Sequence, residues 1–497
     1  MTPEEENAVE QLEAFQISEK RIALQTLAGL GKVETYSDEI AKLLDDEEAP
    51  VRKEAAFTLG KATWSSSKSS QSIARTLASS LQDEDKIVRA EVVRAIASLG
   101  KDAVNTVIDR IEKILGKEQE EEPALAVLET FAALGEGARF GSFLNHPSPN
   151  VCRVALVETG RSPEARVKFA HTIREQLGHQ DTSVRLAAVQ ASGELGSGCS
   201  EAHLEALVAL RTTDRQPKVR RAAVQAVGKA GVLGVPFLVH FFHDQDEGVR
   251  HFAAETLGGI GGETAAESAA EMVEHEDGPV RMAALMALGR LKGDGRDHSR
   301  LIAKHLHDSD FSARLAAIQA LSDLNACDEA RSVGALCKDD NKGIRQAAVS
   351  ALAKMGKDGA EEAVRYLDDP DAAVRQAAVR VFSPLHSKLP ADLALPHADE
   401  VCRKLNDDDW RVRFAAVVAL GDLHTGQYAT QVAVMCNDDD NQVRRSAVTA
   451  LVKLGATASH VAAFLRDEDA GVRKEAEIAY ADLKANGPDD DNISECD

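Results

Sequence analysis

One phrase of seventeen residues recurs along the chain and constrains its fold more than any other feature. It reads DNKGIRQAAVSALAKMG at Asp340–Gly356, and similar phrases occupy Glu84–Gly100, Arg215–Gly231 and Asp439–Gly455. Each copy begins with polar residues, continues with Val or Ile followed by Arg, and ends with an Ala-rich stretch and Gly. A chain of such copies needs no single large core, because each copy buries its apolar side against its neighbours. The sequence therefore predicts a linear array of repeats.

The arginine that follows Val or Ile marks the register of each copy, and we call it the register arginine. Twelve copies have an arginine at the register position, and three others have Lys20, Ala124 or Cys152 there. The fifteen copies are spaced by about 32 residues on average, which is typical of helical repeats. We expect the array to span residues 8–484, with a weak junction around 118–152 and an acidic, disordered tail at 485–497. The twelve register arginines are Arg52, Arg89, Arg185, Arg220, Arg250, Arg281, Arg314, Arg345, Arg375, Arg413, Arg444 and Arg473.

Each copy is predicted to form two helices, of which the second carries the recurring phrase. In Val280–Leu291 the apolar residues recur at steps of three and four, which places them on one face of a helix. Three residues before the Val there is usually an Asp or Ser that can cap the helix, as at Asp85 and Ser148. The closing Gly suits a left-handed helix end. The predicted fold is all-α, a right-handed α-solenoid superhelix of about fifteen two-helix repeats.

A second acidic residue lies six residues before the register arginine in most copies. Asp339 and Asp369 are examples. Such regular spacing favours a ladder in which the register arginine of one repeat pairs with a carboxylate of the neighbouring turn. The alternative is a row of independent, solvated charges that contribute little to stability. The other acids at this position are Asp46, Asp83, Asp244, Asp308, Asp407, Asp438 and Asp467.

The net charge of −23 argues against nucleic acid as a partner, because a negative surface repels phosphates. Only 4% of residues are aromatic, so few side chains could stack on bases. We expect instead a partner protein with basic segments, bound along an acidic concave surface.

Seven cysteines without a CxxC pair indicate reduced thiols in the cytoplasm or the nucleus. Neither a signal peptide nor a membrane span is predicted from the apolar stretches.

The recurring phrase resembles the HEAT-repeat superfamily, specifically the phycobilisome-lyase-type HEAT-like repeat. The resemblance implies one of three activities: a non-catalytic scaffold, a bilin lyase or the diiron enzyme deoxyhypusine hydroxylase. The hydroxylase requires four His-Glu dyads, and here His251 is followed by Phe252, which cannot bind iron. The only His-Glu pair, His275-Glu276, lies in a predicted turn. We therefore expect no hydroxylase activity, no cofactor, no metal and no catalytic residue.

Two possible functions remain. The first is a non-enzymatic scaffold or adaptor, which includes an importin-like carrier. The second is a bilin-lyase-like or other cofactor-handling enzyme. For the scaffold, we expect partners to dock on residues that follow the register arginine on the second helices. Two longer spacings, at 64–72 and 383–400, are predicted to be loops on one edge of the array. The expected docking residues are Leu186, Arg221, His251, Met282, Met286, Leu315, Phe414 and Val418.

Overall fold

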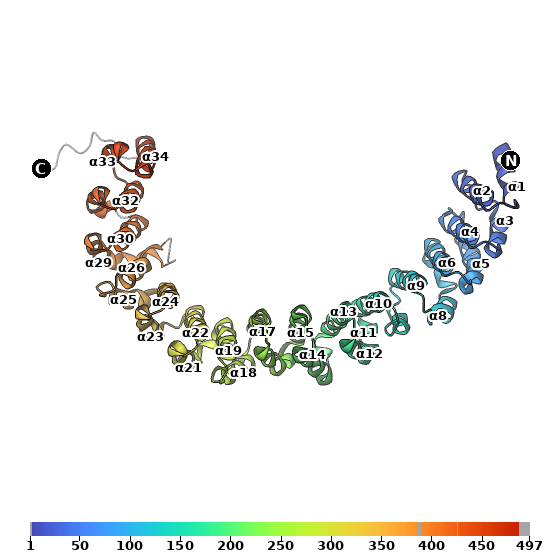
Figure 1. Cartoon of the computed structure of the whole chain (residues 1–497), viewed down its shortest axis with the longest axis horizontal. Coiled ribbons are helices and arrows are strands. Elements are labelled where there is room, and N and C mark those ends of the chain that lie inside the picture. The colour runs from blue at the N-terminus through green and yellow to red at the C-terminus, as the bar shows by residue number, and fades with distance from the viewer. Residues whose placement is uncertain (1, 385–388, 425, 487–497) are drawn as a thin grey trace. The chain divides into compact units, whose positions relative to one another are not determined.

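The structure is a computed structural model that describes residues 2–384, 389–424 and 426–486. These residues form α-helices and short 3-10 turns, and no strand occurs among them. The chain divides into two compact units, Met1–Phe237 and Leu238–Asp497. Within each unit, helix pairs follow one another in chain order (Figure 1).

The second helices of the first unit carry the recurring phrase, as predicted. Each packs against the second helix of the next repeat, so that these helices form a continuous row. Their bounds are α2 Ile17–Gly29, α4 Ala49–Lys61, α6 Lys86–Ser98, α9 Glu121–Leu134, α10 Pro149–Arg161, α13 Thr182–Gly193 and α15 Pro217–Lys229.

The second unit contains a similar row of second helices. In the described residues the two rows supply fifteen second helices, which confirms the predicted all-α solenoid and its number of repeats. Their bounds are α17 Glu247–Ile260, α19 Gly278–Arg290, α22 Phe311–Asp323, α24 Lys342–Lys354, α26 Ala372–Val381, α30 Trp410–Asp422, α32 Asn441–Lys453 and α34 Ala470–Asn486.

The first helices are shorter and less regular, as their weaker pattern predicts. Many end in a 3-10 turn: α21, for example, is followed by His305–His307. In the first unit they are α1 Pro3–Gln11, α3 Ser37–Lys42, α5 Ser67–Leu77, α7 Lys101–Asn105, α8 Ile108–Leu115, α11 Pro163–Lys168, α12 Ala170–Glu175 and α14 Glu201–Thr213. A short helix, α16 Val235–Leu238, lies where the units meet in the chain. In the second unit they are α18 Glu263–Val273, α20 Gly293–Arg296, α21 Ser299–Lys304, α23 Ala330–Ala335, α25 Gly356–Val364, α28 Ala391–Ala394, α29 Ala398–Arg403, α31 Ala429–Val434 and α33 Ala458–Ala462.

Local sequence signals explain where the second helices begin and end. The Asp85 carboxylate accepts from the backbone N–H groups of Ile87 and Val88 at the start of α6. Ser148 was predicted to cap α10 in the same way, but its hydroxyl donates to Glu121 of the preceding repeat instead. At the other end of α6, Gly100 has φ 95°, a conformation that favours glycine.

Within each unit the second helices lie on the inner side of the row and the first helices on the outer side (Figure 1). Small residues bring neighbouring second helices close together. A Cβ added at Gly289 of α19 would lie only 2.7 Å from the Cα of Ala320 in α22. At this point the two helices pack with glycine against alanine.

Four segments were singled out in the sequence, and the structure describes them to different extents. The Ser-rich stretch 64–72 is a loop only at its start, because Ser66 caps helix α5, which begins at Ser67. In the 383–400 stretch, α28 and the start of α29 are helical, and residues 385–388 lie outside the described residues. The tail from 487 onward also lies outside them. The unit boundary falls at 237/238, whereas residues 118–152 lie inside the first unit.

Candidate functional site

The register arginines hold together the turn before each second helix. All twelve donate from Nη1 to the backbone carbonyl of the residue six positions earlier. The Nη1–O distance is 2.9 Å from Arg281 to His275 and 2.7 Å from Arg345 to Asp339. These bonds satisfy carbonyls at the end of the first helix that would otherwise lack a partner. The sequence reasoning did not anticipate this contact, which occurs within each repeat.

Among the described residues, at least seven of these arginines also bind a carboxylate of the next repeat through two parallel hydrogen bonds. Arg281, for example, donates to Asp308 at 2.7 and 2.6 Å, and both side chains are nearly buried. The Arg281 guanidinium holds the pKa of the Asp308 carboxyl well below its usual range. Lys20 makes a similar pair with Asp46. The other six pairs are Arg52–Asp83, Arg89–Glu118, Arg185–Asp214, Arg375–Asp407, Arg413–Asp438 and Arg444–Asp467.

The ladder of ion pairs is interrupted in the second unit. His275 occupies the acidic position facing Arg250, whose buried Nε has no hydrogen-bond partner among the described residues. Arg314 approaches Asp339 only to 3.8 Å.

The third interruption is at Arg345. The carboxylate expected to receive this arginine, Asp369, is bound instead by Lys338 at 2.9 Å. Among the described residues, Arg345 donates only to the backbone carbonyls of Asp339 and Asp340.

One stripe of side chains runs along the inner face of the second helices. It consists of the residues three before and one, five and nine after the register position, and we call it the inner stripe. The stripe contains sixteen basic and eight acidic residues in a chain of charge −23. The stripe therefore carries more basic than acidic residues, and the expected acidic concave surface stays a prediction. The acids concentrate instead in the turns, where they cap helices and accept from register arginines.

An apolar groove opens on the inner face of α17, α19 and α22, with a volume of about 400 Å³. Met282, Met286, Leu315 and Phe311 provide its apolar lining, and we call it the methionine groove. Met286 and Leu315 are half-buried and Phe311 is exposed, whereas Met282 is only 9% exposed. Met282, a predicted docking residue, lines the groove although its side chain is nearly buried. The groove also includes His251, Glu247, Arg290, Gln319 and Asp323.

A groove of different chemistry lies between α24 and α26 in the same unit, with a volume of about 320 Å³. Lys342, Arg345 and Arg380 line it, and no acidic residue does. We call it the basic groove. Its other lining residues are Gln346, Val349, Ser350, Ala373, Gln376 and Ala377. The sequence reasoning did not select these residues, although the inner stripe passes through Lys342, Gln346, Ser350, Gln376 and Arg380.

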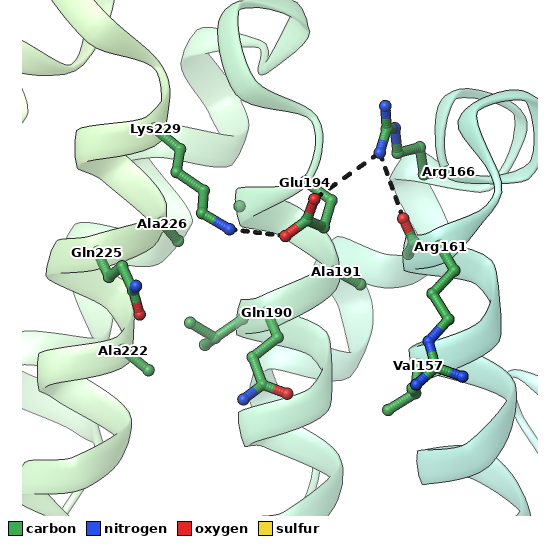
Figure 2. A pocket seen from close by; sticks show the side chains of 13 residues that line it. Val157, Arg161, Arg166, Gln190, Ala191, Glu194, Ala222, Gln225, Ala226 and Lys229 are labelled. Carbon is green, nitrogen blue, oxygen red and sulfur yellow. Dashed lines mark hydrogen bonds and ion pairs between the residues drawn. The ribbon is translucent and has the colours of Figure 1, made fainter.

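Two more grooves lie beside second helices, one in each unit. The groove around α13 in the first unit has a volume of about 470 Å³ and a polar rim (Figure 2). There Glu194 pairs with Lys229 at 2.6 Å and with Arg166 at 3.9 Å. Phe414 and Val418, both predicted docking residues, line a groove between α30 and α32. Leu186 is half-buried on α13 and Arg221 is exposed on α15, and neither lines one of these grooves.

The described residues were compared with the side-chain arrangements that metal binding and nucleophilic catalysis need. No group of three or more His, Cys, Asp and Glu side chains among them could hold a metal ion. Six cysteines are free, and burial raises the pKa of Cys337 and Cys436 to about 12, so these thiols are poor nucleophiles at neutral pH. Within the described residues, every helix is too short or too polar to cross a membrane.

Comparison with known families identifies the repeats. The model of the HEAT-repeat family matches residues 37–132, 138–228, 235–322, 299–383 and 398–481, which is most of the chain. The chain therefore belongs to the HEAT-repeat family. The narrower phycobilisome-lyase subtype stays a prediction. No curated protein matches the sequence.

Solved structures with a similar fold include three of Kap121p. A Kap121p mutant aligns with a TM-score of 0.54 and 11% identity over 91% of this chain and 57% of that chain. Kap121p itself gives a TM-score of 0.51 and 12% identity over 97% and 57%. Kap121p bound to Pho4p gives 0.52 and 12% over 90% and 56%. The chain spans little more than half the length of these proteins, and the low identities show a shared fold alone.

Proposed function

We propose that this protein is a non-enzymatic scaffold or adaptor that binds a partner protein on the inner face of its second helices. The methionine groove carries this proposal, because it exposes apolar side chains on a face lined mainly by polar ones. Methionine side chains are flexible and polarizable, so they adapt to apolar side chains of different shapes. The structurally similar Kap121p has been crystallised bound to Pho4p, which supports the binding of protein partners by this fold.

The groove's charges define the partner further. Glu247 is exposed at the mouth and makes no ion pair among the described residues, whereas Asp323 is paired with Lys354. Arg290 is likewise occupied by Glu255 at 3.1 Å. Glu247 is therefore the carboxylate available to a ligand, and it favours a basic residue beside an apolar anchor. The partner segment expected here contains a large apolar residue next to Lys or Arg.

The free cysteines support a cytoplasmic or nuclear location.

Peptide selection followed by titration tests this proposal. Sixteen-residue peptides are selected from a displayed random library on the full chain, and their affinities are measured by fluorescence anisotropy. We expect the selected peptides to share an apolar residue flanked by basic ones. Met286→Glu should weaken their binding tenfold or more, because it places a charge in the apolar lining. Glu247→Lys should weaken binding less, by about threefold.

Val434→Glu is the matched control, because Val434 is 60% exposed on the first helix α31, away from the grooves. This variant should bind the peptides as the wild type does. Equal binding by the Met286→Glu variant would contradict the proposed site. Visible absorbance from a bound bilin, or stoichiometric iron in the purified protein, would contradict a non-enzymatic function.

A further inference from the structure

We propose that the basic groove is a second docking site, and that it binds an acidic segment of a partner protein. The inference extends the proposed protein-binding function to a surface of opposite chemistry in the same unit. It starts from Arg345, the register arginine whose predicted acceptor is bound by Lys338. The Nε and Nη2 groups of Arg345 therefore have no carboxylate partner among the described residues. Arg345 lines the groove and forms no ion pair of the ladder within the described residues.

Two further cations face the same groove. Lys342 on α24 and Arg380 on α26 are both exposed, and neither forms an ion pair within the described part of the chain. Elsewhere on the inner stripe, cations are often neutralised by the neighbouring repeat, as Lys229 is by Glu194. Three positive groups without a carboxylate in the lining form a local site for negative charge.

The remaining lining residues favour a polypeptide over other anions. Gln346 and Gln376 offer amide groups that can donate to and accept from an extended peptide backbone. No aromatic side chain lines the groove, so bases of a nucleic acid would find no stacking surface. The guanidinium of Arg345 or Arg380 can bind a carboxylate through two parallel hydrogen bonds. The groove therefore fits a segment with two or three Asp or Glu side chains.

The test uses the full chain and a fluorescein-labelled peptide of ten glutamates and serines in alternation, followed by fluorescence anisotropy. The wild type should bind it, and the variant Lys342→Gln with Arg380→Gln should bind at least tenfold more weakly. These two side chains make no hydrogen bond or ion pair with the rest of the described chain, so the variant is expected to fold normally. Arg345→Gln should also weaken binding, and circular dichroism shows whether it remains folded.

Lys304→Gln with Lys357→Gln is the matched control, because it removes the same charge from exposed residues on α21 and α25. Binding by this control should stay within twofold of the wild type. Absence of peptide binding by the wild type, or equal weakening in both double variants, would overturn the inference. Tighter binding of a twelve-residue oligothymidylate that is lost in the same groove variant would also overturn it, in favour of nucleic acid. Failure here leaves the methionine groove untouched, because peptides of a different chemistry test that site.

Discussion

The methionine groove and the basic groove both lie on the inner face of the second unit. They are formed by different copies of the same repeated sequence, yet their linings differ. The register arginine of α19, Arg281, is bound on both sides of its guanidinium and is 12% exposed. The register arginine of α24, Arg345, reaches only backbone carbonyls and lines its groove. The difference arises one repeat further along. Asp308 is available to Arg281, whereas Asp369 is bound by Lys338.

The comparison shows how one repeat can produce two kinds of surface. When the arginine is bound to the next repeat, its charge is neutralised and the neighbouring stripe residues determine the lining. In the methionine groove these are Met282, Met286 and Leu315. When the carboxylate is bound elsewhere, the arginine remains available and adds to the positive charge of the groove. In this repeat Lys338 binds Asp369, and the register arginine Arg345 lines the groove.

The largest expected difference between the two grooves is in stability. Arg281→Ala should destabilise its repeats by about 3 kcal/mol, because it leaves the Asp308 carboxylate buried without its partner. Arg345→Ala should cost only about 1 kcal/mol, because it loses hydrogen bonds to carbonyls that can turn to water. Hydrogen exchange in α19, α22 and α24, followed by mass spectrometry, measures both effects locally. Equal losses would show that the carboxylate contributes nothing beyond the carbonyl bonds.

The second largest difference between the grooves is expected in how closely their second helices pack. Gly289→Ala places a Cβ 2.7 Å from Ala320 Cα, so α19 and α22 must separate, at a cost of about 2 kcal/mol. The same register position beside the basic groove is already alanine, Ala353. There Ala353→Gly should cost about 1 kcal/mol, mainly through helix propensity. Urea denaturation of both variants provides the measurement, and a neutral Gly289→Ala would contradict the close approach.

Acid should weaken the methionine-groove repeats through Asp308. Its pKa is lowered mainly by the hydrogen bonds from Arg281, so the unfolded chain binds this proton more readily than the folded one. The stabilisation is therefore fully present above the unfolded pKa of about 4 and is lost as the pH falls towards the folded pKa. Between pH 6 and pH 3, exchange protection of α19 and α22 should fall more in the wild type than in an Asp308→Asn variant. An identical pH response in both proteins would remove Asp308 as the cause.

The smallest effect is expected at the ion pair between Lys354 and Asp323. Lys354 at the end of α24 binds Asp323 of the methionine groove at 3.3 Å, and both side chains are at least one-third exposed. Exposed pairs contribute little, so Lys354→Gln should change the free energy of unfolding by less than about 0.5 kcal/mol. It should, however, free Asp323 to attract basic peptides. Thermal unfolding and the anisotropy titration of the selected peptides separate these two effects.

Local features of the sequence determined the array and its ladder positions. The recurring phrase predicts a helix from its apolar spacing, a cap such as Asp85, and in most copies an acid at a fixed distance. The fifteen copies share most of these signals, so errors in single copies did not change the predicted fold. The same stripe periodicity could also have indicated Lys342 and Arg380, had charge been counted along the inner positions rather than over the whole chain.

Tertiary structure decided which chemistry each groove exposes. The sequence places an acid opposite both Arg281 and Arg345, and only packing shows that Lys338 reaches Asp369 first. Likewise, Met282 and Leu315 each follow a register arginine, but Met282 is only 9% exposed whereas Leu315 is half-buried. Helix periodicity is a property of one segment, whereas pairing and burial depend on distances between side chains of different repeats.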